Sequence, residues 1–185
     1  MMPEISLNIL DIAENSTRAQ ATLITISAEA DSKADTLTVV IGDNGCGMTP
    51  EQVEQVTDPF FTTRKTRRVG LGVPFFKLAA ELSGGSFSIS SEVGKGTVVT
   101  AVFGLSHMDR MPLGDMPSTI LTLVTMHEDT DFVYTYRYDD DSFVLDTAQM
   151  REILGGISFK EPEVSAYILE YLKENTAEVT GGRPI

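Results

Sequence analysis

The stretch Asp43-Asn44-Gly45-Cys46-Gly47-Met48 follows directly after the apolar run at residues 37–41. A strand that delivers a carboxylate and then two spaced glycines into a turn places an acceptor beside backbone that can closely approach a flat ligand. Asp-Asn-Gly is also an ordinary turn sequence, so this stretch alone does not separate a pocket from a turn. The neighbouring segments favour the floor of a pocket.

Length, cysteine content and hydropathy limit the class of protein. A chain of 185 residues suits one domain, or one domain with a small addition, and can bury a core without crosslinks. The single Cys46 cannot form an intramolecular disulfide. No apolar run is long enough to span a bilayer, and Glu4 stands where a signal peptide would be basic. We therefore predict a cytoplasmic protein without a membrane partner.

The charge of the chain is strongly negative and uneven. A formal charge of −13 repels phosphate backbones and argues against nucleic acid as a partner. Residues 1–105 hold 8 Lys+Arg against 12 Asp+Glu, whereas residues 106–185 hold 6 against 15. We predict a ligand-binding domain over 1–105, a linker over 106–117, and an acidic α+β appendage over 118–185.

Residues 4–20 have the periodicity of an amphipathic helix, with Ile5, Ile9 and Ile12 on one stripe. The opposite stripe carries two amides, a carboxylate and a guanidinium, at Asn8, Asp11, Asn15 and Arg18. A solvated helix face normally mixes Lys and Glu, so this stripe favours a binding surface. A merely solvated face is the alternative.

A basic run precedes a pair of glycines. The run Arg64-Lys65-Thr66-Arg67-Arg68 holds four of the 14 positive charges, and Gly70 and Gly72 follow it at the start of a predicted helix. Backbone amides at a helix N-terminus offer hydrogen-bond donors and the positive end of a dipole to phosphate. In so acidic a chain the run favours a polyanionic ligand. A basic surface loop is the alternative.

The remaining periodicities predict an α/β sandwich with helices over one face of a mixed sheet. The expected elements are strands at 21–30 and 36–41, a helix at 50–56 capped by Thr49, a helix at 75–82, and strands around 87–89 and 97–103. In the second segment we expect strands at 118–126, 132–138 and 142–145, a helix capped by Asp146, a helix at 161–175, and a frayed tail at 180–185.

Five short motifs, taken in order, resemble the GHKL group, which covers gyrase, mismatch-repair and chaperone ATPases, histidine kinases and serine-kinase anti-sigma factors. Residues 11–16 are similar to its N box, 43–47 to its first glycine box, 59–63 to its F box, 69–73 to its second glycine box, and 94–97 to its closing glycine-threonine turn. The resemblance covers about residues 4–104 and is closest to the histidine-kinase branch. It implies the two-layer α/β (α+β) sandwich of the Bergerat fold.

The resemblance implies ATP and Mg²⁺ as cofactors. Asp43 would accept a hydrogen bond from the adenine amino group, while Gly47 and Thr97 hold a water against the ring. Guanine presents a carbonyl there, so adenine should be preferred. Asn15 would ligate Mg²⁺, Arg18 would reach the phosphates, and residues 62–69 would form a lid. The ATP-binding set implied is Asn15, Arg18, Asp43, Gly45, Gly47, Met48, Phe60, Thr63, Arg64, Lys65, Gly70, Leu71, Gly72, Val73 and Thr97.

The sequence departs from the family pattern at three places. Arg68 stands where the second glycine box usually has a further glycine, and no helical hairpin with a phosphoacceptor His precedes the N box. His127 ends a strand-like run, so we predict a structural role for it. Asp11 is the predicted catalytic residue, because hydrolysing members hold a Glu general base at that place. Aspartate is one methylene shorter, so a hydrogen bond to Arg18 or to a metal-bound water is the alternative.

Three functions follow from the resemblance. The first is a signalling kinase that acts in trans on a partner protein, either response-regulator-like or another phosphoacceptor. The second is a slow ATPase that works as a nucleotide-driven switch. The third is a non-enzymatic sensor of adenine nucleotide. Residues 118–185 are predicted to form a partner-binding surface or a homodimer surface.

Overall fold

The computed structural model of the chain describes residues 3–60 and 71–185. Its helices and strands are α1 (Ile5–Arg18), β1 (Leu23–Asp31), β2 (Thr36–Asp43), α2 (Pro50–Thr57), α3 (Gly72–Leu82), β3 (Ser86–Glu92), β4 (Gly96–Gly104), α4 (Met116–Met126), β5 (Asp131–Tyr138), β6 (Asp141–Asp146), α5 (Thr147–Leu154) and α6 (Pro162–Thr180).

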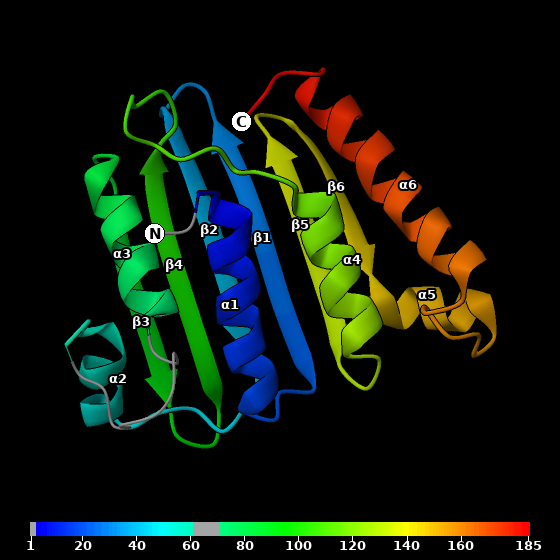
Figure 1. Cartoon of the computed structure of the whole chain (residues 1–185), viewed down its shortest axis with the longest axis horizontal. Helices are drawn as coiled ribbons and strands as arrows, with labels where there is room; N and C mark the ends of the chain where they lie inside the picture. Colours follow the sequence, from blue (N-terminus) through cyan, green and yellow to red (C-terminus); the bar gives the residue numbers. More distant parts are fainter. Residues whose placement is uncertain (1–2, 61–70) are drawn as a thin grey trace.

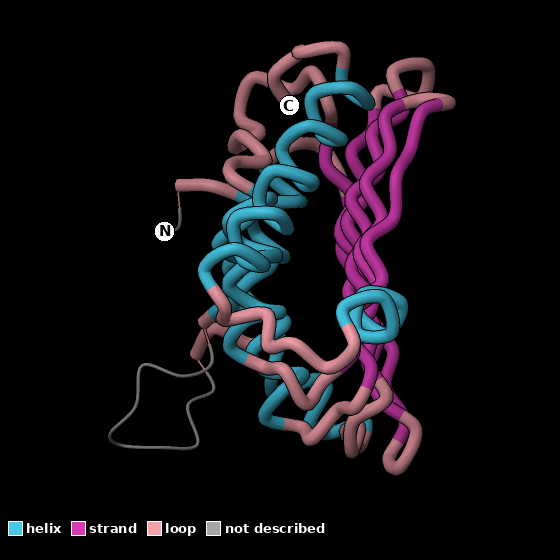
Figure 2. Tube along the Cα trace, turned by 90° about the vertical axis from the view of Figure 1, so that its right-hand side faces the viewer, coloured by secondary structure: helices cyan, strands magenta, loops and turns pink. Residues whose placement is uncertain are grey.

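The strands form one mixed sheet in the order β3-β4-β2-β1-β5-β6. All neighbours are antiparallel except β1 and β5, which run parallel. Helices α1, α3, α4 and α6 pack against one face of this sheet (Figure 1), and the side view in Figure 2 shows the helix layer and the strand layer. The predicted two-layer sandwich is confirmed.

Alternation of apolar and polar residues along the strands explains the two layers. In β1 the even positions from Ile24 to Ala30 are buried under the helices, and the odd positions point to the other face. Helix α1 presents Ile5, Ile9 and Ile12 to the same core, as its periodicity predicts. Each such side chain contributes about 1.5–3 kcal/mol by leaving water.

Residues 118–126 belong to helix α4, so the predicted strand is wrong. Asp115 caps the helix, since its Oδ1 accepts a hydrogen bond from Ser118 N at 3.0 Å. Met116, Ile120 and Leu123 lie three or four positions apart and are buried. The β-branched residues of this segment suggested a strand. Helical spacing instead places its buried side chains on one face, which packs against α1, α6 and β5.

The second segment joins the sheet through β5, which pairs along the whole of β1. The predicted strands at 132–138 and 142–145 are present, and Asp146 caps α5 as expected. Helix α6 continues to Thr180 and ends at Gly181, which has a φ of 62°. It is therefore longer than the predicted helix at 161–175.

The tail is packed, so its predicted fraying is wrong. The carbonyl of Ile185 accepts a hydrogen bond from Leu113 N at 2.9 Å. The guanidinium of Arg183 lies 4.5 Å from the ring centroid of Tyr138. One hydrophobic cluster runs through both segments, from Phe103 and Ile41 to Phe132 and Leu172. No helix among the described residues is long and apolar enough to cross a membrane.

Candidate functional site

A cavity of about 270 Å³ lies beside the turn at residues 43–48, between α1 and the start of α3. Apolar side chains form most of its wall, among them Ile12, Ile41, Val73 and Val99. Six residues of the predicted binding set line it, namely Asn15, Asp43, Gly47, Met48, Val73 and Thr97. The sequence thus identified residues from α1, β2, α3 and β4 that the fold brings together.

The carboxylate of Asp43 is held in a fixed orientation at the end of β2. Its Oδ2 accepts a hydrogen bond from Ser16 Oγ at 2.6 Å, and its Oδ1 accepts one from Gly45 N at 2.8 Å. Each oxygen can accept more than one hydrogen bond, so both remain able to receive a ligand donor. Ser16 was not among the predicted site residues. Helical spacing places it on the same stripe as Ile5, Ile9 and Ile12, and a hydroxyl within that buried stripe was the signal of its role.

The turn after β2 requires glycine. Gly47 has a φ of 71°, and a Cβ on it would overlap the carbonyl of Glu92. Gly45 is buried, and a Cβ there would lie 2.8 Å from the carbonyl oxygen of Ala19. The turn is tied on both sides, since Cys46 N donates to Ala19 O at 3.0 Å and Cys46 O accepts from Gly94 N at 2.8 Å. Gly45 shapes this turn and does not line the cavity.

A hydroxyl pair lies beside Asp43. Thr97 is the register partner of Asp43, and its Oγ1 is 2.8 Å from Ser91 Oγ. Ser91 Oγ also accepts a hydrogen bond from Met48 N at 2.8 Å. Ser91 therefore fixes both Thr97 and the turn. This role was not predicted. Ser91 lies on the same face of β3 as Phe87 and Ile89, out of step with the other serines of the strand, and this break in the alternation was the signal.

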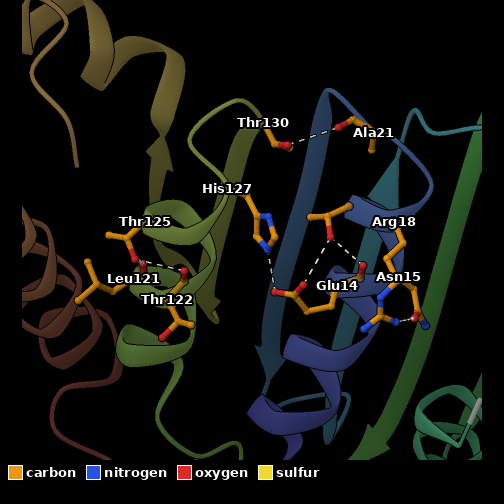
Figure 3. Close-up of polar contacts among 10 residues, drawn as sticks. Glu14, Asn15, Arg18, Ala21, Leu121, Thr122, Thr125, His127 and Thr130 are labelled. Carbon is orange, nitrogen blue, oxygen red and sulfur yellow. Dashed lines mark hydrogen bonds and ion pairs between the residues drawn. The ribbon is translucent and has the colours of Figure 1, made fainter. Parts of the chain in front are cut away.

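Asn15 and Arg18 face each other across one turn of α1 (Figure 3). Arg18 Nη1 donates a hydrogen bond to Asn15 Oδ1 at 3.0 Å. The amide oxygen predicted to hold Mg²⁺ therefore accepts a hydrogen bond from Arg18. Arg18 itself is exposed and does not line the cavity. The alternative pairing of Asp11 with Arg18 is not formed as a hydrogen bond among the described residues.

Asp11 lies against the first residue of α3. A Cβ on Gly72 would overlap the Asp11 carboxylate, so the glycine lets α1 and α3 approach at this point. Burial raises the pKa of Asp11, the nearby Arg18 lowers it, and Glu14 raises it. A raised pKa makes this carboxylate a better proton acceptor near neutral pH than an ordinary surface aspartate.

Glu14 connects α1 to α4. Its Oε1 is 2.8 Å from His127 Nε2, and Figure 3 shows the imidazole reaching across from the end of α4. His127 is the C-cap residue of that helix and does not end a strand. Since Glu14 directly precedes Asn15, the contact ties the second segment to the helix that carries the cavity-lining amide.

Several predicted residues have no described contact with the cavity. Four of them lie outside the described residues, as does the proposed lid at 62–69: Thr63, Arg64, Lys65 and Gly70. Phe60 is described, and its side chain is 91% exposed. Leu71 and Gly72 precede the cavity-lining Val73 at the start of α3. Among residues 3–60 and 71–185, no group of three or more His, Cys, Asp or Glu side chains could hold a metal ion.

Comparison with known proteins gives one matching family, described as histidine kinase-, DNA gyrase B- and HSP90-like ATPase, over residues 2–107. A putative sensor protein of Shewanella frigidimarina is 32% identical over 107 residues, which are 57% of this chain and 16% of that protein. The sensor histidine kinase ZraS of Salmonella typhimurium is 36% identical over 93 residues, 50% of this chain and 20% of that one. The chain thus matches a fifth or less of each relative's length.

The fold also resembles a solved structure described as the N-terminal domain of a DNA repair protein. The TM-score is 0.54 at 16% identity, and the match covers 78% of this chain and 53% of that one. This likeness concerns the fold alone. It covers more of the chain than residues 2–107 could supply, so it includes part of the second segment.

Proposed function

We propose that the cavity binds ATP together with Mg²⁺, because the chain belongs to the histidine kinase-, DNA gyrase B- and HSP90-like ATPase family. The observation that carries this proposal is the fixed carboxylate of Asp43, held by Ser16 and Gly45 N beside the Thr97 hydroxyl. Ile12, Ile41 and the other apolar residues of the wall suit a flat aromatic ring. Both oxygens of this partly buried carboxylate can still accept a hydrogen bond from a ligand donor at the base of the cavity.

The adenine amino group is that donor. Guanine offers a carbonyl oxygen at the equivalent position, which would face the Asp43 carboxylate without a proton between them. A site that hydrogen-bonds one ligand rejects an analogue that leaves its buried polar group unpaired. We therefore expect the cavity to select ATP over GTP.

Asn15 is the proposed ligand of Mg²⁺. The absence of a protein-only metal cluster in the described residues suits this ion, which commonly uses one or two protein oxygens together with water and phosphate. When bound, Mg²⁺ neutralises phosphate charge. Arg18, now hydrogen-bonded to Asn15, is exposed and free to turn its guanidinium to a phosphate. Thr63, Arg64, Lys65 and Gly70 complete the proposed phosphate site, with Leu71, Gly72 and Val73 at the start of α3.

The proposed activity is phosphoryl transfer in trans to a residue on a partner protein, with residues 118–185 as the partner-binding surface. Histidine kinases among the relatives motivate this choice. Slow ATP hydrolysis is the second candidate, and the raised pKa of Asp11 favours it, since the carboxylate can accept a proton from water. Asp11 would be the proton acceptor in either reaction.

Calorimetry with the purified chain and excess Mg²⁺ tests the binding step. We expect heat from ATP, at least tenfold weaker binding of GTP, and no heat from ATP with Asp43→Ala. Asp140→Ala, which removes an exposed carboxylate that does not line the cavity, is the matched control. If Asp43→Ala binds ATP as the unaltered chain does, the cavity is not the nucleotide site.

Incubation with γ-labelled ATP, with and without cell extract, separates the activities. Label on an added protein supports transfer in trans, and free phosphate supports hydrolysis. Nucleotide binding without either product would contradict both and leave a nucleotide sensor. Asp11→Asn should abolish phosphate release while ATP still binds. Unchanged release would show that Asp11 accepts no proton in the reaction.

A further inference from the structure

A second cavity lies in the acidic segment, on the side of the molecule away from α2 and α3 (Figure 1). It has a volume of about 190 Å³ and is formed by the end of β6, by α5 and by α6. Its apolar wall consists of Val144, Leu145, Met150, Ile153, Leu154, Tyr167 and Tyr171. We call this cavity the α5–α6 groove.

The rim of the α5–α6 groove exposes large apolar side chains. Ile153 is 83% exposed, Tyr167 is 60% exposed and Val144 is 49% exposed. Met150 and Leu154 on the same helix are partly buried against the core and also line the groove, so Ile153 extends this apolar side of α5 to the exposed rim. Apolar residues gathered around a surface hollow are typical of a docking site, whereas scattered ones are ordinary.

The groove is already formed in the chain alone. The Tyr171 hydroxyl donates a hydrogen bond to the carbonyl of Val144 at 3.2 Å, which joins α6 to β6. The Tyr171 ring also meets Phe143 edge to face, with centroids 6.1 Å apart. A partner would therefore find a fixed wall and would lose less entropy on binding than with a collapsed surface.

Acidic residues flank the groove on α6. Glu163, Glu170 and Glu174 lie within about 60° of Tyr167 around the helix, at 3.6 residues per turn. All three are exposed and form no ion pair among the described residues. Glu170 and Glu174 are four apart, a like-charge spacing that weakens a helix. A bound cation would relieve this repulsion.

Within residues 3–60 and 71–185, no Lys or Arg forms an ion pair with the glutamates of this rim. Arg151 on α5 points elsewhere, since it pairs with Asp131 and donates to the carbonyls of Glu128 and Thr130. Lys173 lies about 120° from Tyr167 around α6. A second copy of the chain would bring an equally acidic segment, with 6 Lys+Arg against 15 Asp+Glu over 106–185. Like charge makes it a poor occupant.

We infer that the α5–α6 groove is a docking site for a basic amphipathic helix of a partner protein. Apolar residues of that helix, spaced at i, i+3, i+4 and i+7, would enter the groove beside Ile153 and Tyr167, and flanking Lys or Arg would meet Glu163 and Glu170. A helix fits better than an added strand, because six of the nine lining residues belong to α5 and α6, although the edge strand β6 supplies the other three.

A labelled peptide tests the inference with the full chain at physiological salt. The probe is a 14-residue helix with Leu at the four apolar spacings and Lys elsewhere, measured by fluorescence anisotropy. One comparison peptide replaces Lys by Glu, and another replaces Leu by Ser. We expect that only the Leu/Lys peptide binds. The double variant Ile153→Ser, Tyr167→Ser should bind this peptide at least tenfold more weakly. The double variant Glu163→Gln, Glu170→Gln should bind it severalfold more weakly, and its binding should depend less on salt.

Met108→Ser is the matched control, since Met108 is 91% exposed and does not line the groove. Circular dichroism should show all variants folded, and their ATP binding should be unchanged, which separates this proposal from the nucleotide site. Equal binding of the Leu/Lys and Ser/Lys peptides would overturn the inference and leave only charge attraction. Dimerisation that the Ile153→Ser variant abolishes would show a second copy as the occupant. New protection of β6 amides would show an added strand. Either result would overturn it as well.

Discussion

The contact between Ser16 and Asp43 yields the sharpest test of the proposed nucleotide site. Ser16 is 4% exposed, and its Oγ lies 2.6 Å from Asp43 Oδ2. A hydrogen bond to a charged acceptor contributes about 1.5–3 kcal/mol. Ser16→Ala removes this bond but leaves the bond from Gly45 N, so we expect the free energy of unfolding to fall by about 1–2 kcal/mol.

The same substitution should weaken ATP binding. Without Ser16 the carboxylate keeps one of its two fixed contacts and can turn away from the adenine position. A loss of about 1.4 kcal/mol corresponds to roughly tenfold weaker binding. Urea unfolding measures the stability, and calorimetry with ATP and Mg²⁺ measures the affinity.

A double-mutant cycle shows whether the two residues act together. Ser16→Ala and Asp43→Asn are compared singly and combined, and we expect a coupling of about 1 kcal/mol or more in unfolding. Ser88→Ala is the control, because Ser88 is an exposed serine on the other face of the sheet. A coupling near zero would refute the view that Ser16 positions Asp43, even if Ser16→Ala alone destabilises the chain.

Three further predictions concern the backbone and the titrating groups. Gly47→Ala should destabilise the chain by about 2 kcal/mol more than Gly94→Ala in urea unfolding, because both have positive φ but only Gly47 would overlap backbone. Asp11→Asn should slightly stabilise the chain at pH 7. The raised pKa of Asp11 means that the folded state binds more protons than the unfolded state just above pH 4, so wild-type stability falls as pH rises there, and the variant should lack this fall in urea midpoints. Burial, followed by the charge of Tyr138, raises the pKa of Tyr136 from 10.0 to about 12, so the unfolded chain loses its proton first. Tyr136 should therefore contribute a fall in stability of about 2–3 kcal/mol between pH 10 and 12, which Tyr136→Phe should remove, while the buried Tyr134 adds a fall of its own.

Local signals in the sequence predicted six of the residues that line the cavity. Asp43 and Gly47 stand at the end of an apolar strand, and Asn15 repeats with helical spacing on a polar stripe. Their positions in the cavity depend on neighbours that are close in sequence, so a short motif is enough to predict these positions. The alternating burial of β1, β2 and β4 was equally visible, because side chains point to alternate faces of a strand.

Contacts between distant segments could not be predicted in this way. Ser91 reaches Met48 only through the fold, and Glu14 meets His127 across more than a hundred residues. For α4, local preference was misleading: its Thr, Ile and Val residues favour strands, but the capping by Asp115 and the packing of one buried face decide for a helix. The tail at 180–185 looked polar and loose, yet Arg183 covers Tyr138.

The parallel pairing of β5 with β1 has a consequence for biosynthesis. Strand β1 ends at Asp31 and its partner begins only at Asp131, so a ribosome completes most of the sheet long before this edge is covered. An uncovered edge offers unpaired amides and carbonyls to other nascent chains, and such distant pairing is slow to form. A fragment that stops before Asp131 would keep this edge open permanently and should aggregate.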